Sequence, residues 1–136
     1  MGDMKRLLAM TIVLVLALTG CAATAGAVTP ASLKLPDSVE PTAGACAETQ
    51  GAYAVVQVNP DVPSPRCQKV GEEQKLQVVN NTEQTVKAHL GQVDLTVGPH
   101  QEATASLAFG QYLVPGVHRL AIVGQLETAV ELWLRS

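Results

Sequence analysis

The sequence has few aromatic residues, few charges and little that could build a catalytic or nucleic-acid-binding site. Among 136 residues there are one Trp, two Tyr and one Phe, and the formal net charge is −3. A nucleic-acid-binding surface needs a basic face and aromatic platforms for the bases, so this composition argues against such a partner. Gly-rich phosphate loops and the G-x-S-x-G motif of serine hydrolases are also absent. The residues thus indicate no enzyme class.

Methionine occurs only within the first ten residues, a part of the chain that differs in composition from the rest. There, Lys5 and Arg6 precede a charge-free run of 12 residues, 7–18, which is apolar except for Thr11. A basic start, a short apolar run and small residues at its end are the three parts of a secretory signal peptide. The run is too short to cross a bilayer, which needs about 20 residues.

The apolar run ends in Leu18-Thr19-Gly20-Cys21, which resembles the lipobox of bacterial lipoprotein precursors. In that family the cysteine sulfur receives a diacylglycerol, the chain is cut before the cysteine, and the new N-terminus is acylated. The resemblance covers residues 1–21, and implies that 1–20 are a signal peptide and that lipidated Cys21 begins the mature protein. It also implies export and attachment to the periplasmic or extracellular face of a bacterial membrane. An uncleaved membrane helix and an ordinary secreted protein are the alternatives.

Residues 22–45 are rich in Ala, Thr and Ser, contain three Pro and lack aromatic residues. Such a composition buries little surface, so residues 21–45 are interpreted as the lipidated cysteine followed by a flexible tether. The alternating Leu33-Lys34-Leu35 patch offers an alternative, in which the tether adds an edge strand to the domain. Residues 46–136 are predicted to form one small domain, because about 90 residues leave no room for a second core.

With Cys21 assigned to the anchor, Cys46 and Cys67 remain. An even number of cysteines in an exported domain predicts a structural disulfide, because the compartment is oxidising. A metal–thiolate pair and a redox-active dithiol are the alternatives. Neither is favoured, because the spacing is not C-x-x-C and no nearby His or Cys completes a site.

After Cys46 the apolar residues alternate with period two, and helical periodicity is hard to find. About seven short strands are predicted, with turn residues between them. The two strands that flank Gly91-Gln92 are predicted to form a tight hairpin. The pattern predicts an all-β fold, a small antiparallel β-sandwich of Greek-key, cupredoxin-like or immunoglobulin-like arrangement. The expected strands are residues 53–58, 75–79, 85–90, 93–97, 103–109, 117–123 and 128–134.

The strand spacing and the Pro115-Gly116 turn before the last hairpin resemble cupredoxin-like sandwiches across residues 70–135. A blue-copper site needs two His, a Cys thiolate and usually an axial Met. Residues 21–136 contain no Met, and no cysteine lies near the C-terminal strands. The resemblance therefore implies the fold without the electron-transfer site, and no cofactor is expected.

Three histidines and a few carboxylates are the remaining candidates for chemistry. Alternation places His89 on a solvated face, His100 follows a turn, and His118 is expected at the edge of the core with one hydrogen-bond partner. A Zn or Cu site built from all three is an alternative, which no H-x-H spacing supports. Asp94 and Glu131 are expected to face solvent, and no motif makes them a catalytic pair.

Trp133, Tyr112 and Tyr53 are the side chains suited to a recognition surface, and Tyr112 and Trp133 are the candidate binding residues. Trp133 lies opposite Leu132 on the final strand, so either the tether or a loop covers it, or it caps an exposed patch. In the second case the apolar loop 112–114 would lie beside it and bind a partner.

The sequence therefore favours a lipid-anchored cell-envelope protein that displays a non-catalytic β-sandwich for binding or structural support. Its expected partners are the membrane, through Cys21, and an envelope protein. An exported metal-binding protein that uses the histidines is the first alternative, and an envelope hydrolase is the second.

Overall fold

The computed structural model describes residues 33–124 and 129–136. The signal peptide, Cys21 and the first part of the predicted tether lie outside these ranges. Within them, no helix is long and apolar enough to cross a membrane. The described chain consists of strands, loops and one short 3-10 turn.

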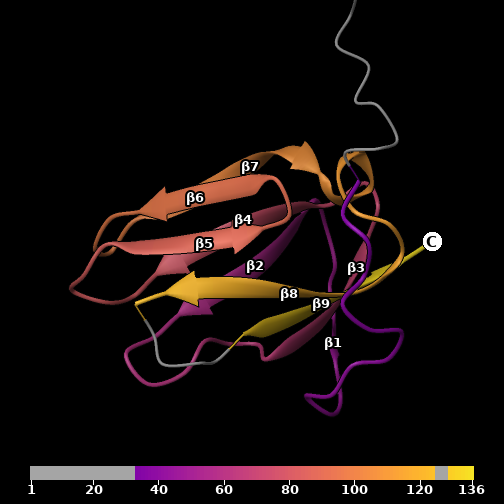
Figure 1. Cartoon of the computed structure of the whole chain (residues 1–136). Coiled ribbons are helices and arrows are strands. Elements are labelled where there is room, and N and C mark those ends of the chain that lie inside the picture. The colour runs from indigo at the N-terminus through magenta and orange to yellow at the C-terminus, as the bar shows by residue number, and fades with distance from the viewer. Residues whose placement is uncertain (1–32, 125–128) are drawn as a thin grey trace, which may run out of the picture.

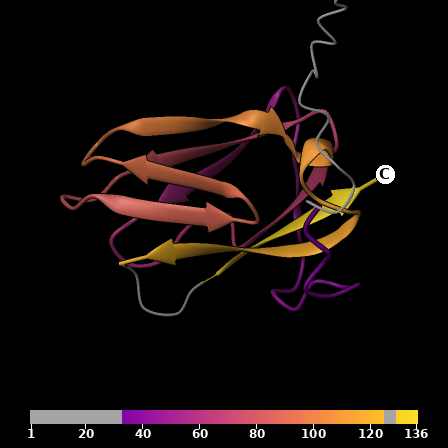
Figure 2. The same ribbon diagram turned by 45° about the horizontal axis from the view of Figure 1, so that its top comes forward.

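Two sheets pack against each other to form a sandwich (Figure 1). One sheet has six strands in the order β1-β3-β9-β8-β5-β6, and the other has three in the order β2-β4-β7. A view turned by 45° shows the same two layers (Figure 2). The strands are β1 Ala47–Glu48, β2 Tyr53–Val58, β3 Cys67–Gly71, β4 Lys75–Asn80, β5 Val86–Leu90, β6 Val93–Val97, β7 Glu102–Ala108, β8 Gly116–Val123 and β9 Val130–Arg135.

The predicted all-β sandwich is confirmed, and each of the seven expected strands occurs with bounds within two residues of those predicted. Strands β1 and β3 were not predicted. Two residues of β3, Gln68 and Val70, point inward, and only Val70 is apolar. Nε2 of Gln68 donates to the Val55 carbonyl at 2.9 Å. A polar side chain that crosses between the sheets hides the alternation by which strands are found.

The sandwich is mixed rather than antiparallel, which corrects the prediction of strand direction. The pairs β1–β3, β3–β9 and β2–β4 are parallel. The connection between β2 and β4 passes through β3 in the other sheet, so β4 returns in the same direction as β2. Alternation within one strand carries no information on the direction of its neighbour.

The predicted hairpin is confirmed as β5–β6. The two strands are antiparallel, with Leu90 opposite Val93, and Gly91 sits in the turn with φ of +60°. A side chain is strained at that angle, so glycine suits this position.

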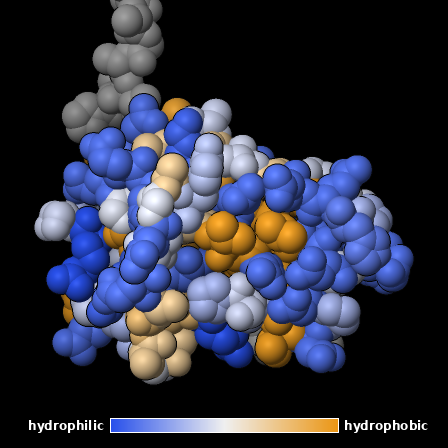
Figure 3. Space-filling model, turned by 180° about the vertical axis from the view of Figure 1, so that it is seen from behind, coloured by the Kyte–Doolittle hydropathy of each residue, from blue (hydrophilic) through white to orange (hydrophobic). Residues whose placement is uncertain are grey.

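The core lies between the two sheets and is made of inward-facing aliphatic side chains from both. Phe109 and Tyr112, two of the four aromatic residues, are fully buried with ring centroids 6.2 Å apart. From behind, the molecular surface is mainly hydrophilic, with a small apolar patch near its middle (Figure 3).

Residues 33–45, here called the strap, run along the sandwich at the end where the C-terminus lies (Figure 1). The backbone N–H of Asp37 donates to the Val117 carbonyl at 2.8 Å, and the N–H of Val117 donates to the Ser38 carbonyl at 2.9 Å. These bonds use the part of the β8 edge that β5 does not pair with, since β5 covers only Ala121 to Val123. A free strand edge binds backbone of any composition.

This part of the predicted tether is therefore hydrogen-bonded to the domain. The predicted alternative, an edge strand at Leu33-Lys34-Leu35, is represented only by isolated bridges, Lys34 with Leu113 and Ser38 with Val117.

Candidate functional site

A hollow of about 410 Å³ opens at one end of the sandwich. The β2–β3 connection, the β4–β5 loop and the residue after β8 form it, and we call it the loop-end hollow. Two carboxylates, Asp61 and Glu83, line it together with hydroxyl and amide side chains, and Pro60 and Val86 add apolar surface, so the hollow is acidic and of mixed polarity. Its lining residues are Pro60, Asp61, Thr82, Glu83, Gln84, Thr85, Val86 and Gly124.

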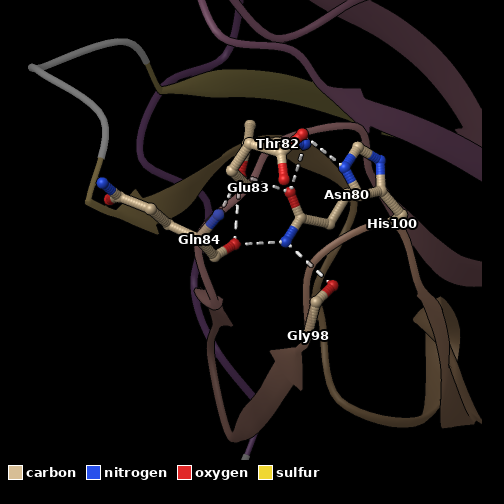
Figure 4. A network of polar contacts seen from close by, with 6 residues as sticks. All are labelled: Asn80, Thr82, Glu83, Gln84, Gly98 and His100. Atoms are coloured by element: carbon tan, nitrogen blue, oxygen red, sulfur yellow. Dashed lines mark hydrogen bonds and ion pairs between the residues drawn. The ribbon is translucent and has the colours of Figure 1, made fainter.

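The buried side chain of Asn80 holds the β4–β5 loop in place (Figure 4). Its Nδ2 donates to the carbonyls of Gln84, Val97 and Gly98 at 2.7, 3.1 and 3.0 Å. Its Oδ1 accepts from the backbone N–H and the hydroxyl of Thr82 at 2.9 and 2.8 Å. A buried amide with every polar atom bonded fixes its surroundings, so the wall of the hollow is pre-organised.

Glu83 also contacts the neighbouring β6–β7 loop, where its Oε1 lies 2.8 Å from Nε2 of His100 (Figure 4). The backbone of His100 has a positive φ of 55°, a conformation that residues other than glycine adopt only rarely. No motif in the sequence predicts this site. Its signal is the uninterrupted polar run Asn80-Asn81-Thr82-Glu83-Gln84, a composition that is equally typical of an ordinary turn.

The strap and the loops that line the hollow lie at opposite ends of the sandwich (Figures 1 and 2). Strands β2 and β4 are parallel, so both run toward the hollow and end beside it. The strap instead bridges Leu113, just after the 3-10 turn Phe109–Gln111 that follows β7 at the other end. The part of the described chain nearest Cys21 is thus remote from the hollow.

The histidines have separate surroundings. Nδ1 of His89 lies 2.6 Å from Oδ1 of Asp94 on the surface, and His100 contacts Glu83. His118 is fully buried, and its Nε2 donates to the Val114 carbonyl at 2.7 Å, as predicted for a histidine at the core edge. Across residues 33–124 and 129–136, no group of three or more His, Cys, Asp or Glu could hold a metal ion.

Glu131 is buried with 4% of its surface exposed, which corrects the prediction that it faces solvent. The strap covers it. Its carboxylate accepts the backbone N–H of Thr42 and that of Ala43, both at 2.8 Å, and the Thr42 hydroxyl at 2.5 Å. Burial would raise the pKa of Glu131, but these hydrogen bonds and the nearby Arg119 outweigh it and hold the pKa below its ordinary value.

Tyr112 is fully buried, so the prediction that it binds a partner is wrong. The 3-10 turn directs it into the core, with its N–H donating to the Phe109 carbonyl at 3.1 Å. Burial raises the pKa of its hydroxyl. Trp133 is half-buried on the outer face of β9, where the Arg135 guanidinium lies 5.1 Å from its ring centroid. The two residues do not form a common surface.

The predicted disulfide is present between Cys46 and Cys67, whose Cα atoms are 4.5 Å apart. It joins the residue after the strap to the first residue of β3. Cys67 thus lies in a strand that the alternation of apolar residues did not predict.

Stability between about pH 7 and pH 5 should depend on His118. The pKa of His118 is lowered from 6.5, mainly because the side chain is buried. The hydrogen bond to Val114 and the charge of Asp37 act to raise this pKa, and the charge of Lys34 lowers it further. The unfolded chain therefore binds a proton that the folded state excludes, and the free energy of unfolding falls as the pH drops below 6.5. The slope is at most about 1.4 kcal/mol per pH unit.

The measurement is urea unfolding across this range for the wild type and for His118→Gln, whose amide can donate to Val114 but does not titrate. We expect a shallower slope in the variant. Asp37 and Glu131 do not interfere, because both have lowered pKa values and their stabilising effect is lost only in more acidic solution. Equal slopes in the two proteins would contradict the assignment.

Neither a protein-family model nor a curated protein sequence matches the chain. Solved structures with a similar outline include a copper(I) form of an amicyanin variant, at 9% identity and a TM-score of 0.49, over 64% of this chain and 86% of that one. The copper(I)-bound metal-binding domain of the Streptococcus pneumoniae copper-exporting P-type ATPase has 7% identity and a TM-score of 0.49, over 68% of this chain and 97% of that domain. Similarity at this level supports no inference on activity.

Proposed function

We propose that the protein is a lipid-anchored cell-envelope protein that presents a rigid, non-catalytic β-sandwich for binding. The lipobox-like Leu18-Thr19-Gly20-Cys21 motif supports the anchor. The Cys46–Cys67 disulfide supports an oxidising compartment outside the cytoplasm.

The opposite placement of the strap and the loop-end hollow is the observation that carries the binding role. A domain held at one end leaves its other end free to meet partners, and loops on a rigid scaffold are where binding residues concentrate. The Asn80 network keeps this end pre-organised, which lowers the entropy lost on binding.

The lining of the hollow indicates the chemistry of its partner. Asp61 and Glu83 supply negative charge, and Thr82, Gln84 and Thr85 supply hydroxyl and amide groups. This set suits a positively charged, hydrogen-bonding segment of an envelope protein. The described residues that line the hollow include no aromatic side chain of the kind that usually binds apolar ligands.

A photo-cross-linking experiment in intact cells tests this role. A photoreactive amino acid replaces Gln84 in the hollow or, as the matched control, exposed Ser106 on the outer face of β7. We expect Gln84 to form a discrete adduct that Asp61→Asn/Glu83→Gln weakens severalfold, because the double change removes the negative charge. Adducts of equal yield from both positions, or none from Gln84, would contradict the proposal.

A further inference from the structure

Two apolar side chains on the strap are more exposed than any other large apolar side chain of the described chain. Val39 exposes 81% of its surface and Leu35 exposes 72%. Val123, which follows them in exposure, has 63% and lies beside the loop-end hollow. The most exposed apolar groups are therefore at the end nearest Cys21.

Backbone contacts on both sides hold Leu35 in its outward orientation. Before it, the N–H of Lys34 donates to the Tyr112 carbonyl at 2.9 Å. After it, the N–H of Asp37 donates to the Val117 carbonyl at 2.8 Å. These bonds fix the backbone on both sides of Leu35, whose side chain is exposed to solvent.

Pro36 and Gly116 are in close contact, which also fixes this part of the strap. A Cβ atom at Gly116 would lie 2.4 Å from Cβ of Pro36, so only glycine permits this approach. Val39 is held similarly, because Ser38 accepts the Val117 N–H at 2.9 Å and donates its hydroxyl to the Glu40 carbonyl at 2.8 Å. The two apolar side chains are thus presented by an ordered backbone.

The charges beside Leu35 compensate each other. Nζ of Lys34 lies 2.7 Å from Oδ2 of Asp37, so the segment around Leu35 has no net charge. Glu40 follows Val39 and is exposed, as a residue at the headgroup level would be. The apolar side chain of Leu35, beside this neutralised pair, is suited to the boundary between headgroups and acyl chains, whereas Val39 has the negative charge of Glu40 beside it.

The strap is the part of the described chain that is closest in sequence to Cys21. Leu33 follows Cys21 by twelve residues, and a chain of that length spans at most about 42 Å. Whatever conformation these residues adopt, the strap is the described part with the shortest chain to the lipid.

We infer that Leu35 and Val39 insert into the surface of the bilayer to which Cys21 is anchored and so set the orientation of the domain. This inference rests on the proposed lipid anchor. In that orientation the strap end contacts the membrane and the loop-end hollow points away from it. The domain is then docked on the bilayer rather than free on a tether.

Quenching of tryptophan by brominated lipids tests the inference. The full chain, matured and lipidated in cells and with Trp133 changed to Phe, is reconstituted into vesicles of phosphatidylethanolamine and phosphatidylglycerol with brominated acyl chains. Tryptophan is introduced by Leu35→Trp or Val39→Trp. The matched control is Val123→Trp, an exposed apolar position at the opposite end. We expect at least about threefold stronger quenching at the strap positions than at Val123.

Flotation with the vesicles and the mass of the lipid on Cys21 are measured on the same samples. Lipidated, floating protein in which the strap positions and Val123 are quenched equally, or not at all, overturns the inference while the anchor stands. Protein without lipid on Cys21 overturns the anchor, and the inference with it. Near-ultraviolet circular dichroism checks that each variant is folded, and the two strap positions test the inference independently.

Discussion

Replacing Cys21 with alanine should leave the protein as an unprocessed precursor without lipid. The thiol of Cys21 is the only atom on which the proposed diacylglycerol can be built, and cleavage before residue 21 follows that step in lipoprotein precursors. Metabolic labelling with palmitate should therefore fall from a strong signal to background. The intact mass should still include residues 1–20.

The matched control is the double variant Cys46→Ala/Cys67→Ala, which removes the two disulfide-bonded cysteines outside the motif and should retain the palmitate label. An ordinary secreted protein or an uncleaved membrane helix predicts a different result. If the protein is an ordinary secreted protein, Cys21→Ala is cleaved as the wild type is. If residues 7–26 form an uncleaved membrane helix, neither the variant nor the wild type is cleaved. Normal processing of the variant would therefore disprove the lipoprotein proposal.

Removing the disulfide should produce the second large effect, a loss of about 3 kcal/mol in the free energy of unfolding. The bond between Cys46 and Cys67 closes a loop with a sequence separation of 21 residues and so restricts the unfolded chain. Small domains have a net stability of only about 5–10 kcal/mol, so this loss is a large fraction of the total.

Urea unfolding of Cys46→Ser/Cys67→Ser against the wild type measures the effect. A thiol reductant supplies the internal control: it should lower the stability of the wild type by a similar amount and leave the double variant unchanged. A reductant effect in the double variant, or a loss below about 1 kcal/mol, would disprove the structural role.

The strand predictions succeeded wherever one face of a strand meets the core and the other meets solvent. In β5, Val86, Ala88 and Leu90 alternate with exposed neighbours, so the burial pattern repeats the sequence pattern. Strand β3 was not predicted, because the polar residue Gln68 points inward and forms a hydrogen bond to the other sheet. The alternation pattern counts only apolar residues, so it does not detect an amide side chain that is buried with its hydrogen bonds formed.

The prediction of functional positions succeeded for His118 and failed for Glu131 and Tyr112. His118 shares a face with apolar neighbours, and it is buried with one carbonyl partner, as expected. Glu131 lies on the outer face, as alternation indicates, but the strap passes over that face and supplies the donors that bind its carboxylate. The cover comes from residues about ninety positions away, and no local pattern encodes that contact.

The sequence alone determined the all-β class, the β5–β6 hairpin and the Cys46–Cys67 pair, and it is the sole basis for the lipid anchor at Cys21. Each of these depends on residues close in the chain or on counting cysteines. The tertiary structure decided the parallel pairing of β2 and β4, the docking of the strap and the position of the loop-end hollow. These depend on which free backbone edge and which uncovered face meet after folding, and long-range contacts of that kind leave no periodic pattern in the sequence.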